Sequence, residues 1–249
     1  MPLMPAGEPT RRRAPTTGVT PEHFAVRYFE PAPPVVRFER ILRIQGYSDL
    51  GRVRAAITSA ARDMAALAST LSTPRAAYRY VPVRSISDEG LELDGGERFT
   101  CRAFASRLAD CFEVAPLLLG IGDAVGRRIV ELTEAGDLLE AVLLETAGWL
   151  CIEDATRQFT SHLRGEAAAR HCRVTSRLGP GYSYRLGDEQ VSWPLEEQPA
   201  LFGLFGNAEL PVSLMSSCAM HPKLSRSGLY GIGPLHLAPS PPRAASLFN

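Results

Sequence analysis

The chain lacks an excess of charge of either sign, because its 249 residues include 27 basic and 27 acidic side chains. A protein dedicated to nucleic acid carries a basic surplus on its surface, so the composition argues against nucleic acid as a partner. No apolar run approaches the roughly 18 to 20 residues that span a bilayer. The basic run Arg11–Arg13 is not followed by the apolar segment of a secretory signal. We therefore expect no membrane partner and a cytoplasmic location.

Cysteine is also scarce. The five cysteines are Cys101, Cys111, Cys151, Cys172 and Cys218. An odd number without the spacing of a disulfide framework argues against a disulfide-stabilised fold and favours reduced thiols. With 45% hydrophobic and 22% charged residues, the chain has the composition of a globular protein that buries a sizeable core.

Several familiar catalytic motifs are missing from the sequence. It contains no Gly-x-Ser-x-Gly elbow, no HExxH pair and no CxxC. The segment Gly120-Ile-Gly-Asp-Ala-Val-Gly126 is similar to a dinucleotide-binding loop, but its third glycine comes one residue late. No second strand ending in an acidic residue is predicted after it, as ribose binding would need. The pattern therefore favours an ordinary strand-to-helix turn.

Two further groups of polar residues have a structural alternative that we favour. His171-Cys172 and Cys218-Ala-Met-His221 offer metal ligands, but adjacent strand residues point to opposite faces. Buried cysteines are therefore favoured over a zinc site. His162 and Glu166 lie four residues apart on a predicted helix, a spacing that favours a surface pair over an acid–base dyad.

The distribution of proline predicts three parts. Residues 1–34 contain eight prolines and few large apolar residues, so we expect a mobile arm, of which Phe24, Val26, Tyr28 and Phe29 are the residues suited to local packing. Residues 35–233 form the predicted domain. Residues 234–249 carry four prolines and are predicted to be a second tail.

The central part alternates irregularly between the two kinds of secondary structure. The predicted strands cover residues 35–44, 76–86, 91–93, 114–121, 171–176, 212–216 and 228–232. The predicted helices cover residues 50–71, 104–112, 123–134, 138–168 and 195–205. This order predicts a single α+β domain with a mixed or largely antiparallel sheet.

The most informative segment is Arg177-Leu-Gly-Pro-Gly-Tyr182. The Arg177 guanidinium suits a carboxylate, and Gly179 and Gly181 allow close backbone approach. Pro180 stiffens the loop, and Tyr182 offers a flat face to a heterocycle. These groups suit a ligand with a carboxylate at one end and an aromatic base at the other, such as S-adenosylmethionine (AdoMet). An arginine-capped surface turn is the alternative that these six residues leave open.

This segment, followed by Trp193-Pro-Leu-Glu-Glu-Gln198, resembles the AdoMet-binding activation domain of cobalamin-dependent methionine synthase. The resemblance is strongest to the free-standing version of that domain. Further similar segments follow in the same order. They are Ile41–Tyr47, Leu117–Gly122, Gly136–Leu144 and Leu214–Gly228. Together the similar segments cover roughly residues 36 to 232.

The resemblance implies an α+β domain whose twisted, mainly antiparallel sheet is flanked by helices. It implies a reactivation component that supplies AdoMet for the reductive methylation of cob(II)alamin to methylcobalamin on a partner protein. The implied partners are a cobalamin-binding methyltransferase module and a flavodoxin or ferredoxin as electron donor. Arg177 would hold the methionyl carboxylate, and the segment from Gly179 to Tyr182 would line the ligand. No catalytic residue is expected, because such a module contributes orientation alone.

This chain also departs from the family pattern. Residues 183–192 are an insertion beside the proposed pocket, and Met215-Ser216-Ser217 replaces the family's Thr-Glu-Ser. Glu153 and Asp154 are candidates for the acidic residues that help to hold AdoMet in the family. Three alternatives remain open: an activator of another corrinoid methyltransferase, a non-catalytic scaffold or interaction protein with this fold, and a nucleotide-dependent oxidoreductase.

Overall fold

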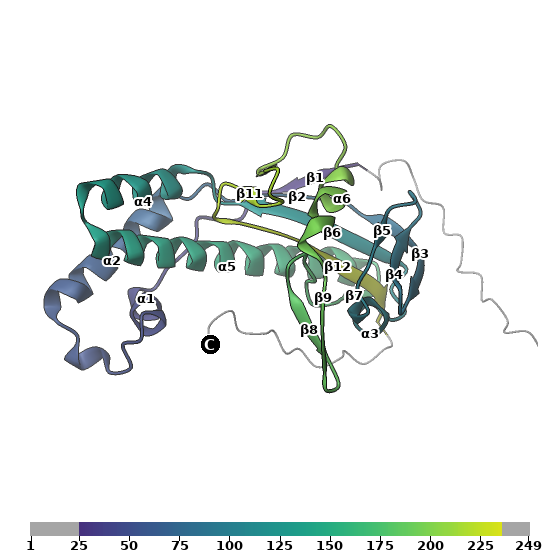
Figure 1. The fold of residues 1–249 in the computed structure, drawn as a ribbon, viewed down its shortest axis with the longest axis horizontal. Helices are drawn as coiled ribbons and strands as arrows, with labels where there is room; N and C mark the ends of the chain where they lie inside the picture. The colour runs from purple at the N-terminus through teal and green to yellow at the C-terminus, as the bar shows by residue number, and fades with distance from the viewer. Residues whose placement is uncertain (1–24, 236–249) are drawn as a thin grey trace, which may run out of the picture.

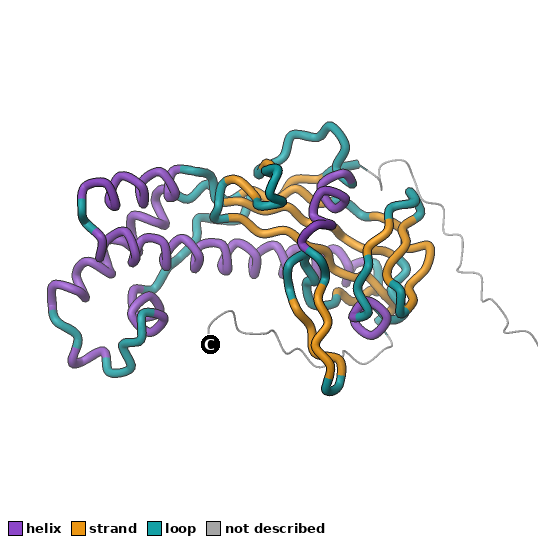
Figure 2. Tube along the Cα trace, in the orientation of Figure 1, coloured by secondary structure: helices purple, strands orange, loops and turns teal. Residues whose placement is uncertain are grey.

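The computed structural model describes residues 25–235. A long helix, α5 (Leu138–Ala169), runs through the molecule. Other helices gather around its amino-terminal half, and a sheet lies along its carboxyl-terminal half (Figure 1). Figure 2 shows the same division, with the helical part on the left and the strands on the right. Helix α5 thus belongs to both parts and joins them into one body.

The helical part consists of short and medium helices packed on α5. They are α1 (Phe38–Ile44), the 3₁₀ turn η2 (Leu50–Arg52), α2 (Ala55–Leu71) and α4 (Ala124–Ala135). Gly136 ends α4 in the left-handed conformation, with φ of 85°, which is the usual way to stop a helix. The chain then enters α5 after two residues, so α4 and α5 lie side by side.

Strand β6 (Glu113–Gly120) is the centre of the sheet, and all eight of its residues are buried. Strand β12 (Ser225–Pro234) pairs with β6 along one edge, and β7 (Cys172–Val174) pairs with β12. An apolar strand buried on both faces is what the continuous hydrophobic run at 114–121 predicts. These three strands bring the carboxyl-terminal segment beside the residues that follow β7.

The other edge of β6 is shared by two strands, β2 (Arg75–Tyr78) and β3 (Val81–Ser87). Strand β1 (Arg27–Phe29) extends the sheet beyond β2. Strands β4 (Gly90–Leu93) and β5 (Arg98–Phe99) extend it beyond β3. Every pairing among the strands of residues 25–235 is antiparallel.

The two faces of β6 enter separate cores. Ala115, Leu117 and Leu119 face α5, whereas Val114 and Leu118 face the opposite side. The opposite side is covered by short elements: α3 (Ala103–Arg107), η3 (Leu195–Glu197) and α6 (Gln198–Gly203). The remaining strands form two small hairpins: β8 (Ser183–Leu186) with β9 (Glu189–Ser192), and β10 (Ser213–Leu214) with β11 (Met220–His221).

The predicted fold class, a single α+β domain with a mainly antiparallel sheet flanked by helices, is confirmed. The strand at 114–121 and the helices at 123–134 and 138–168 lie within one residue of β6, α4 and α5. The predicted pairing of 91–93 with the preceding strand is confirmed by β3 and β4. The glycine motif that ends at Gly126 leads from β6 into α4 and α5. It therefore lacks the parallel second strand of a dinucleotide-binding unit.

The strand predicted at 35–44 is wrong, because residues 38–44 form α1. Ile41 and Leu42 are fully buried, and Phe38 packs against the same core. These residues are spaced three and four apart, which places them on one helical face. The β-branched and aromatic composition of the segment favoured a strand, but packing against α2 and α5 selects the helix.

The predicted amino-terminal arm is also corrected in part. Strand β1, at residues 27–29, lies within it and pairs with β2. Ala32 is held to α5, since its N–H donates to Gln158 Oε1 at 2.8 Å and its carbonyl accepts from Gln158 Nε2 at 3.2 Å. The packing foreseen for Val26 and Phe29 is therefore present. The rest of the arm, residues 1–24, and the tail from 236 lie outside the described residues.

His162 and Glu166 belong to a half-buried network rather than to a surface pair. The hydroxyls of Tyr78 and Tyr80 each donate to Glu166 Oε2 at 2.9 Å, and Arg27 Nη1 lies 3.1 Å from Glu166 Oε1. His162 Nε2 lies 2.9 Å from the Tyr78 hydroxyl. The network joins β1, β2 and α5, so it has a structural role.

This network predicts a dependence of stability on alkaline pH. Burial, reinforced by Glu166, raises the pKa of Tyr78 from 10.0 to about 12. The unfolded chain releases this proton from about pH 10, whereas the folded protein keeps it until about pH 12. The free energy of unfolding should therefore fall by about 2 kcal/mol between those values. Urea titrations at several pH values should show a smaller fall in Tyr78→Phe. An unchanged slope in that variant would contradict the assignment.

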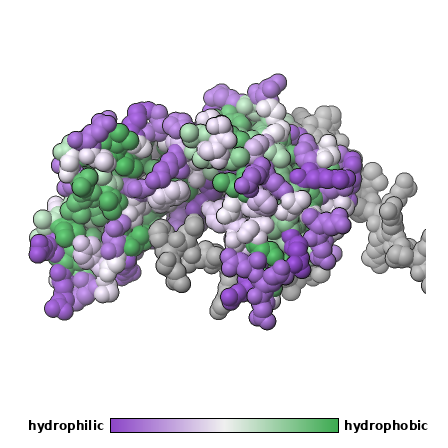
Figure 3. Space-filling view, in the orientation of Figure 1, coloured by the Kyte–Doolittle hydropathy of each residue, from purple (hydrophilic) through white to green (hydrophobic). Residues whose placement is uncertain are grey.

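Three further features of residues 25–235 concern membrane spans, metal sites and exposed apolar side chains. No helix among residues 25–235 is long and apolar enough to cross a membrane. The same part of the chain holds no group of three or more His, Cys, Asp or Glu residues placed to bind a metal ion. Apolar side chains are exposed at the helical end, where Figure 3 shows green surface. They include Val130, Leu138, Leu139 and Val142.

Candidate AdoMet-binding site

The segment after β7 continues alongside β12 and brings Arg177 against that strand. The Thr175 N–H donates to the Gly231 carbonyl at 2.9 Å, and Leu178 and Leu229 exchange two backbone hydrogen bonds of 2.9 and 2.7 Å. A Cβ at Gly228 would overlap the carbonyl oxygen of Leu178, and Gly228 has a φ of 145°. Glycine at this position therefore allows the two backbones to approach.

Residues 179–182 form a tight turn. The Tyr182 N–H donates to the Gly179 carbonyl at 3.3 Å, Pro180 follows Gly179, and Gly181 has a φ of 80°. Proline in the second position and a glycine of positive φ in the third are typical of a type II turn. Two backbone hydrogen bonds with Trp193 hold the turn. The Gly181 N–H donates to the Trp193 carbonyl at 2.8 Å, and the Trp193 N–H donates to the Tyr182 carbonyl at 3.0 Å.

Trp193 is the buried anchor of this turn. Its indole is fully buried between Phe99 and Phe104, with ring centroids 5.4 and 5.0 Å away in edge-to-face geometry. Its Nε1 donates to Glu197 Oε2 at 2.7 Å. These contacts make Trp193 the buried support of the glycine segment.

The backbone of Gly179 is already hydrogen-bonded inside the protein. Its N–H donates to the Tyr184 hydroxyl at 2.7 Å, and that hydroxyl donates back to the Gly179 carbonyl at 3.1 Å. Tyr184 belongs to β8, so the insertion at 183–192 is a hairpin tied to the turn. Burial raises the pKa of Tyr184 to about 12, so this hydroxyl stays protonated at neutral pH. Direct ligand contacts of Gly179, Pro180 and Gly181 remain a prediction.

Arg177 and Tyr182 lie against each other. The guanidinium carbon of Arg177 lies 4.8 Å from the centroid of the Tyr182 ring, and Nη1 donates to the carbonyl of Ser227. Gly179 makes room for this contact, since a Cβ there would lie 2.6 Å from Arg177 Nη1 and 3.2 Å from the Tyr182 ring. Arg177 carries five N–H donors, and residues 25–235 occupy one of them. The others are available to a carboxylate.

A second arginine lies beside Arg177. Arg226 is on β12, one residue before the Ser227 carbonyl that Arg177 binds. Burial and then the charge of Arg177 lower the pKa of Arg226. Tyr230 lies nearby on the same strand, and its hydroxyl is 2.9 Å from Thr160 Oγ1 of α5. Arg226 and Tyr230 both belong to β12, and Arg177 is bonded to the backbone of the same strand. The positive charges of both arginines act on Tyr230, so the three residues form one cluster.

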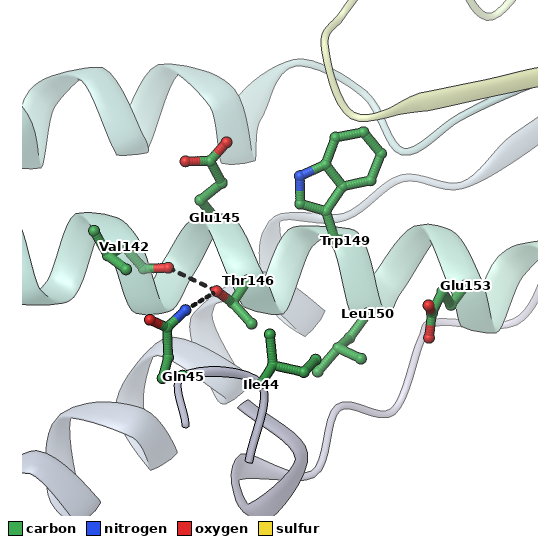
Figure 4. A pocket seen from close by; sticks show the side chains of 8 residues that line it. All are labelled: Ile44, Gln45, Val142, Glu145, Thr146, Trp149, Leu150 and Glu153. Carbon is green, nitrogen blue, oxygen red and sulfur yellow. Dashed lines mark hydrogen bonds between the residues drawn. The ribbon is translucent and has the colours of Figure 1, made fainter. Parts of the chain in front are cut away.

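A hollow of about 310 Å³ lies between α1 and α5 (Figure 4). It is lined by Ile44, Gln45, Val142, Glu145, Thr146, Trp149, Leu150 and Glu153. Gln45 and Thr146 lie next to each other in its wall, where Gln45 Nε2 donates to Thr146 Oγ1 at 2.6 Å. Trp149 offers an aromatic surface, and Glu153 lies at one end.

Glu153 connects the hollow to the arginine cluster. It lines the hollow, and its negative charge acts on Arg226. Its carboxylate is paired with Arg40 at 2.9 Å. Asp154, the other acidic candidate, is 7% exposed and accepts hydrogen bonds from Arg157 and Gln158. Of the two acidic candidates, only Glu153 lines the hollow.

Arg177 and Tyr182, which the sequence predicts as site residues, lie against each other in the structure. Arg226 and Tyr230 are not predicted from the sequence; they come from a segment about 50 residues later. A signal was present, since an arginine within the otherwise buried run Ser225–Ile232 is unusual for a central strand. The pairing of β12 with the glycine segment could not be predicted from that signal.

Comparison with known proteins places the fold. No family model matches the chain, and no curated protein matches it. Among solved structures, the chain is similar to the crystal structure of the MetH reactivation domain bound to AdoHcy, with a TM-score of 0.54 and 13% sequence identity. The match covers 83% of this chain and 78% of the other. This chain therefore has the fold of the MetH reactivation domain.

Proposed function

We propose that this chain is an AdoMet-binding reactivation component of a cobalamin-dependent methionine synthase. The proposal is supported by the contact between Arg177 and Tyr182 in a domain with the MetH reactivation fold. The solved domain binds AdoHcy, which is AdoMet without its transferable methyl group. Arg177 suits the carboxylate end of such a ligand, and Tyr182 suits its sulfonium or its base.

The chemistry assigned to this chain is binding and orientation. In the reaction, one electron reduces cob(II)alamin and the methyl group of AdoMet passes to the cobalt, leaving S-adenosylhomocysteine. Arg177 holds the carboxylate of the aminoacyl end through its free N–H donors. Tyr182 offers a face to the sulfonium or the base. No acid, base or covalent nucleophile of this chain takes part, so its contribution is the fixed position of the donor.

The partners in this proposal are a cobalamin-binding methyltransferase module and a flavodoxin or ferredoxin. The test combines the purified chain with such a module carrying cob(II)alamin, a reductant and AdoMet labelled in its methyl group. We expect the absorbance of cob(II)alamin to give way to that of methylcobalamin, with the label on the cobalt. Methylation at the same rate without this chain would contradict the proposal. A response only to a different corrinoid protein would identify an activator of another corrinoid methyltransferase.

Arg177→Ala tests the binding residue itself. We expect AdoMet affinity to fall by about 1.5 to 3 kcal/mol, the range for a charge-assisted hydrogen bond. Titration calorimetry measures the affinity, and urea unfolding checks that the variant is folded. Arg185→Ala is the matched control, because Arg185 is an exposed arginine of β8 whose side chain has no hydrogen bond within the described residues. Equal affinity in Arg177→Ala and wild type would remove Arg177 from the site.

A further inference from the structure

Arg177 lies against the β12 backbone next to Arg226, and neither side chain has a carboxylate partner among residues 25–235. Arg177 Nη1 binds the Ser227 carbonyl, and Arg226 is the residue before Ser227. Arg177 Nη1 would lie 2.9 Å from a Cβ at Gly228, so the guanidinium rests on the β12 backbone within two residues of Arg226. In residues 25–235, neither side chain forms an ion pair, and Arg226 forms no side-chain hydrogen bond.

The surroundings of Arg226 make this arrangement unfavourable without an anion. The side chain is half-buried, and both burial and the charge of Arg177 disfavour its cationic form. Glu153 is the acidic residue that acts on it, but the Glu153 carboxylate pairs with Arg40 at 2.9 Å. Like charges that share a poorly solvated position repel each other. An anion bound between the two guanidinium groups would relieve that repulsion and satisfy their free donors.

We propose that Arg226 is a second carboxylate-binding residue that grips, together with Arg177, the aminoacyl end of the ligand. This inference rests on the proposed function and extends it to the specificity of the site. A ligand that lacks the carboxylate leaves both guanidinium groups without an anion. The pair therefore discriminates strongly against such a ligand. The site therefore distinguishes AdoMet from its decarboxylated form, which keeps the adenosine, the sulfonium and the amine.

The test compares AdoMet with decarboxylated AdoMet in wild type and in Arg226→Met. Methionine keeps most of the length of the side chain but removes its charge and donors. We expect wild type to prefer AdoMet by tenfold or more, an order-of-magnitude figure for charge-assisted hydrogen bonds. In Arg226→Met, affinity for AdoMet should fall by about tenfold while that for the decarboxylated form changes little. Arg185→Met, at the exposed hairpin position, should behave as wild type.

The possible outcomes separate this inference from the function on which it rests. If wild type binds AdoMet and Arg226→Met binds it equally well, the inference is overturned and the donor site stands. Equal loss of both ligands in Arg226→Met, with a lowered unfolding midpoint, also overturns it, because the residue then acts on the fold. If wild type binds neither ligand, the proposed function and this inference fail together.

Discussion

Trp193→Ala is expected to lower the free energy of unfolding by about 3 to 5 kcal/mol, the range for removing a large aromatic side chain from a core. Trp193 is fully buried between Phe99 and Phe104. Its backbone also forms two hydrogen bonds with the turn at 179–182, one to Gly181 and one to Tyr182. The cavity would therefore loosen the segment that carries Arg177 and Tyr182, and AdoMet binding should weaken with stability.

Urea unfolding followed by far-UV circular dichroism measures this effect. Trp193→Phe keeps most of the packing but loses the indole hydrogen bond to Glu197, so we expect a smaller loss of about 1 to 2 kcal/mol. Trp149→Ala is the matched control at the chain's other tryptophan, which is partly exposed. Equal destabilisation at both tryptophans would show that Trp193 has no special part in the support of the turn.

Gly228→Ala is expected to cost about 3 kcal/mol or more, or to prevent folding. Gly228 has a φ of 145°, and an added Cβ would overlap the Leu178 carbonyl oxygen. Strain at such a dihedral and an overlap with backbone each cost on the order of 1 to 3 kcal/mol. Relief requires β12 to move away from the residue that follows Arg177, so the binding segment would shift too.

Gly136→Ala is the matched control for this substitution. Gly136 also has a positive φ, of 85°, but no atom lies within 4 Å of the position of its Cβ. Its cost should be about 1 kcal/mol, from the dihedral alone. Denaturant titration of both variants gives the comparison. If the two cost the same, the close approach of β12 to the glycine segment does not constrain this position.

Much of this fold could be predicted from the sequence in segments where the pattern of apolar and polar residues is long. The apolar run at 114–121 predicts a doubly buried strand, and Gly136 followed by Asp137 as a cap predicts the start of the long helix at 138–168. Both predicted elements span enough residues for packing and local preference to agree. The segment at 35–44 is short, and its β-branched and aromatic residues suit either structure. There the decision came from contacts with α2 and α5, which a local pattern does not contain.

The insertion at 183–192 shows a similar limit. Gly187 and Asp188 form the two-residue loop of the hairpin, with Leu186 opposite Glu189 and a φ of 59° at Gly187. Glycine followed by aspartate is a recognised hairpin signal. The contact of its Tyr184 with Gly179 could not be foreseen, since it depends on how the hairpin folds back on the turn.

The candidate site divides in the same way. Arg177 and Tyr182 are close in sequence, so their local motif predicts them together. Arg226, Tyr230 and Glu153 reach the cluster through strand pairing and the path of α5. The charge and burial of Arg226 indicate a binding residue only when the positions of those neighbours are known. The proposed function therefore rests on one loop that the sequence predicts, whereas the proposal for the second arginine rests on the tertiary structure.

Titration calorimetry of AdoMet into the purified wild-type chain, with S-adenosylhomocysteine in parallel, tests the central claim most directly. The claim is that the site around Arg177 and Tyr182 binds this donor. It predicts saturable binding of both ligands at micromolar concentrations, with one ligand bound per chain and each competing with the other. Absence of heat and of competition at millimolar ligand would contradict the account, because this chain would then keep the fold without the donor site.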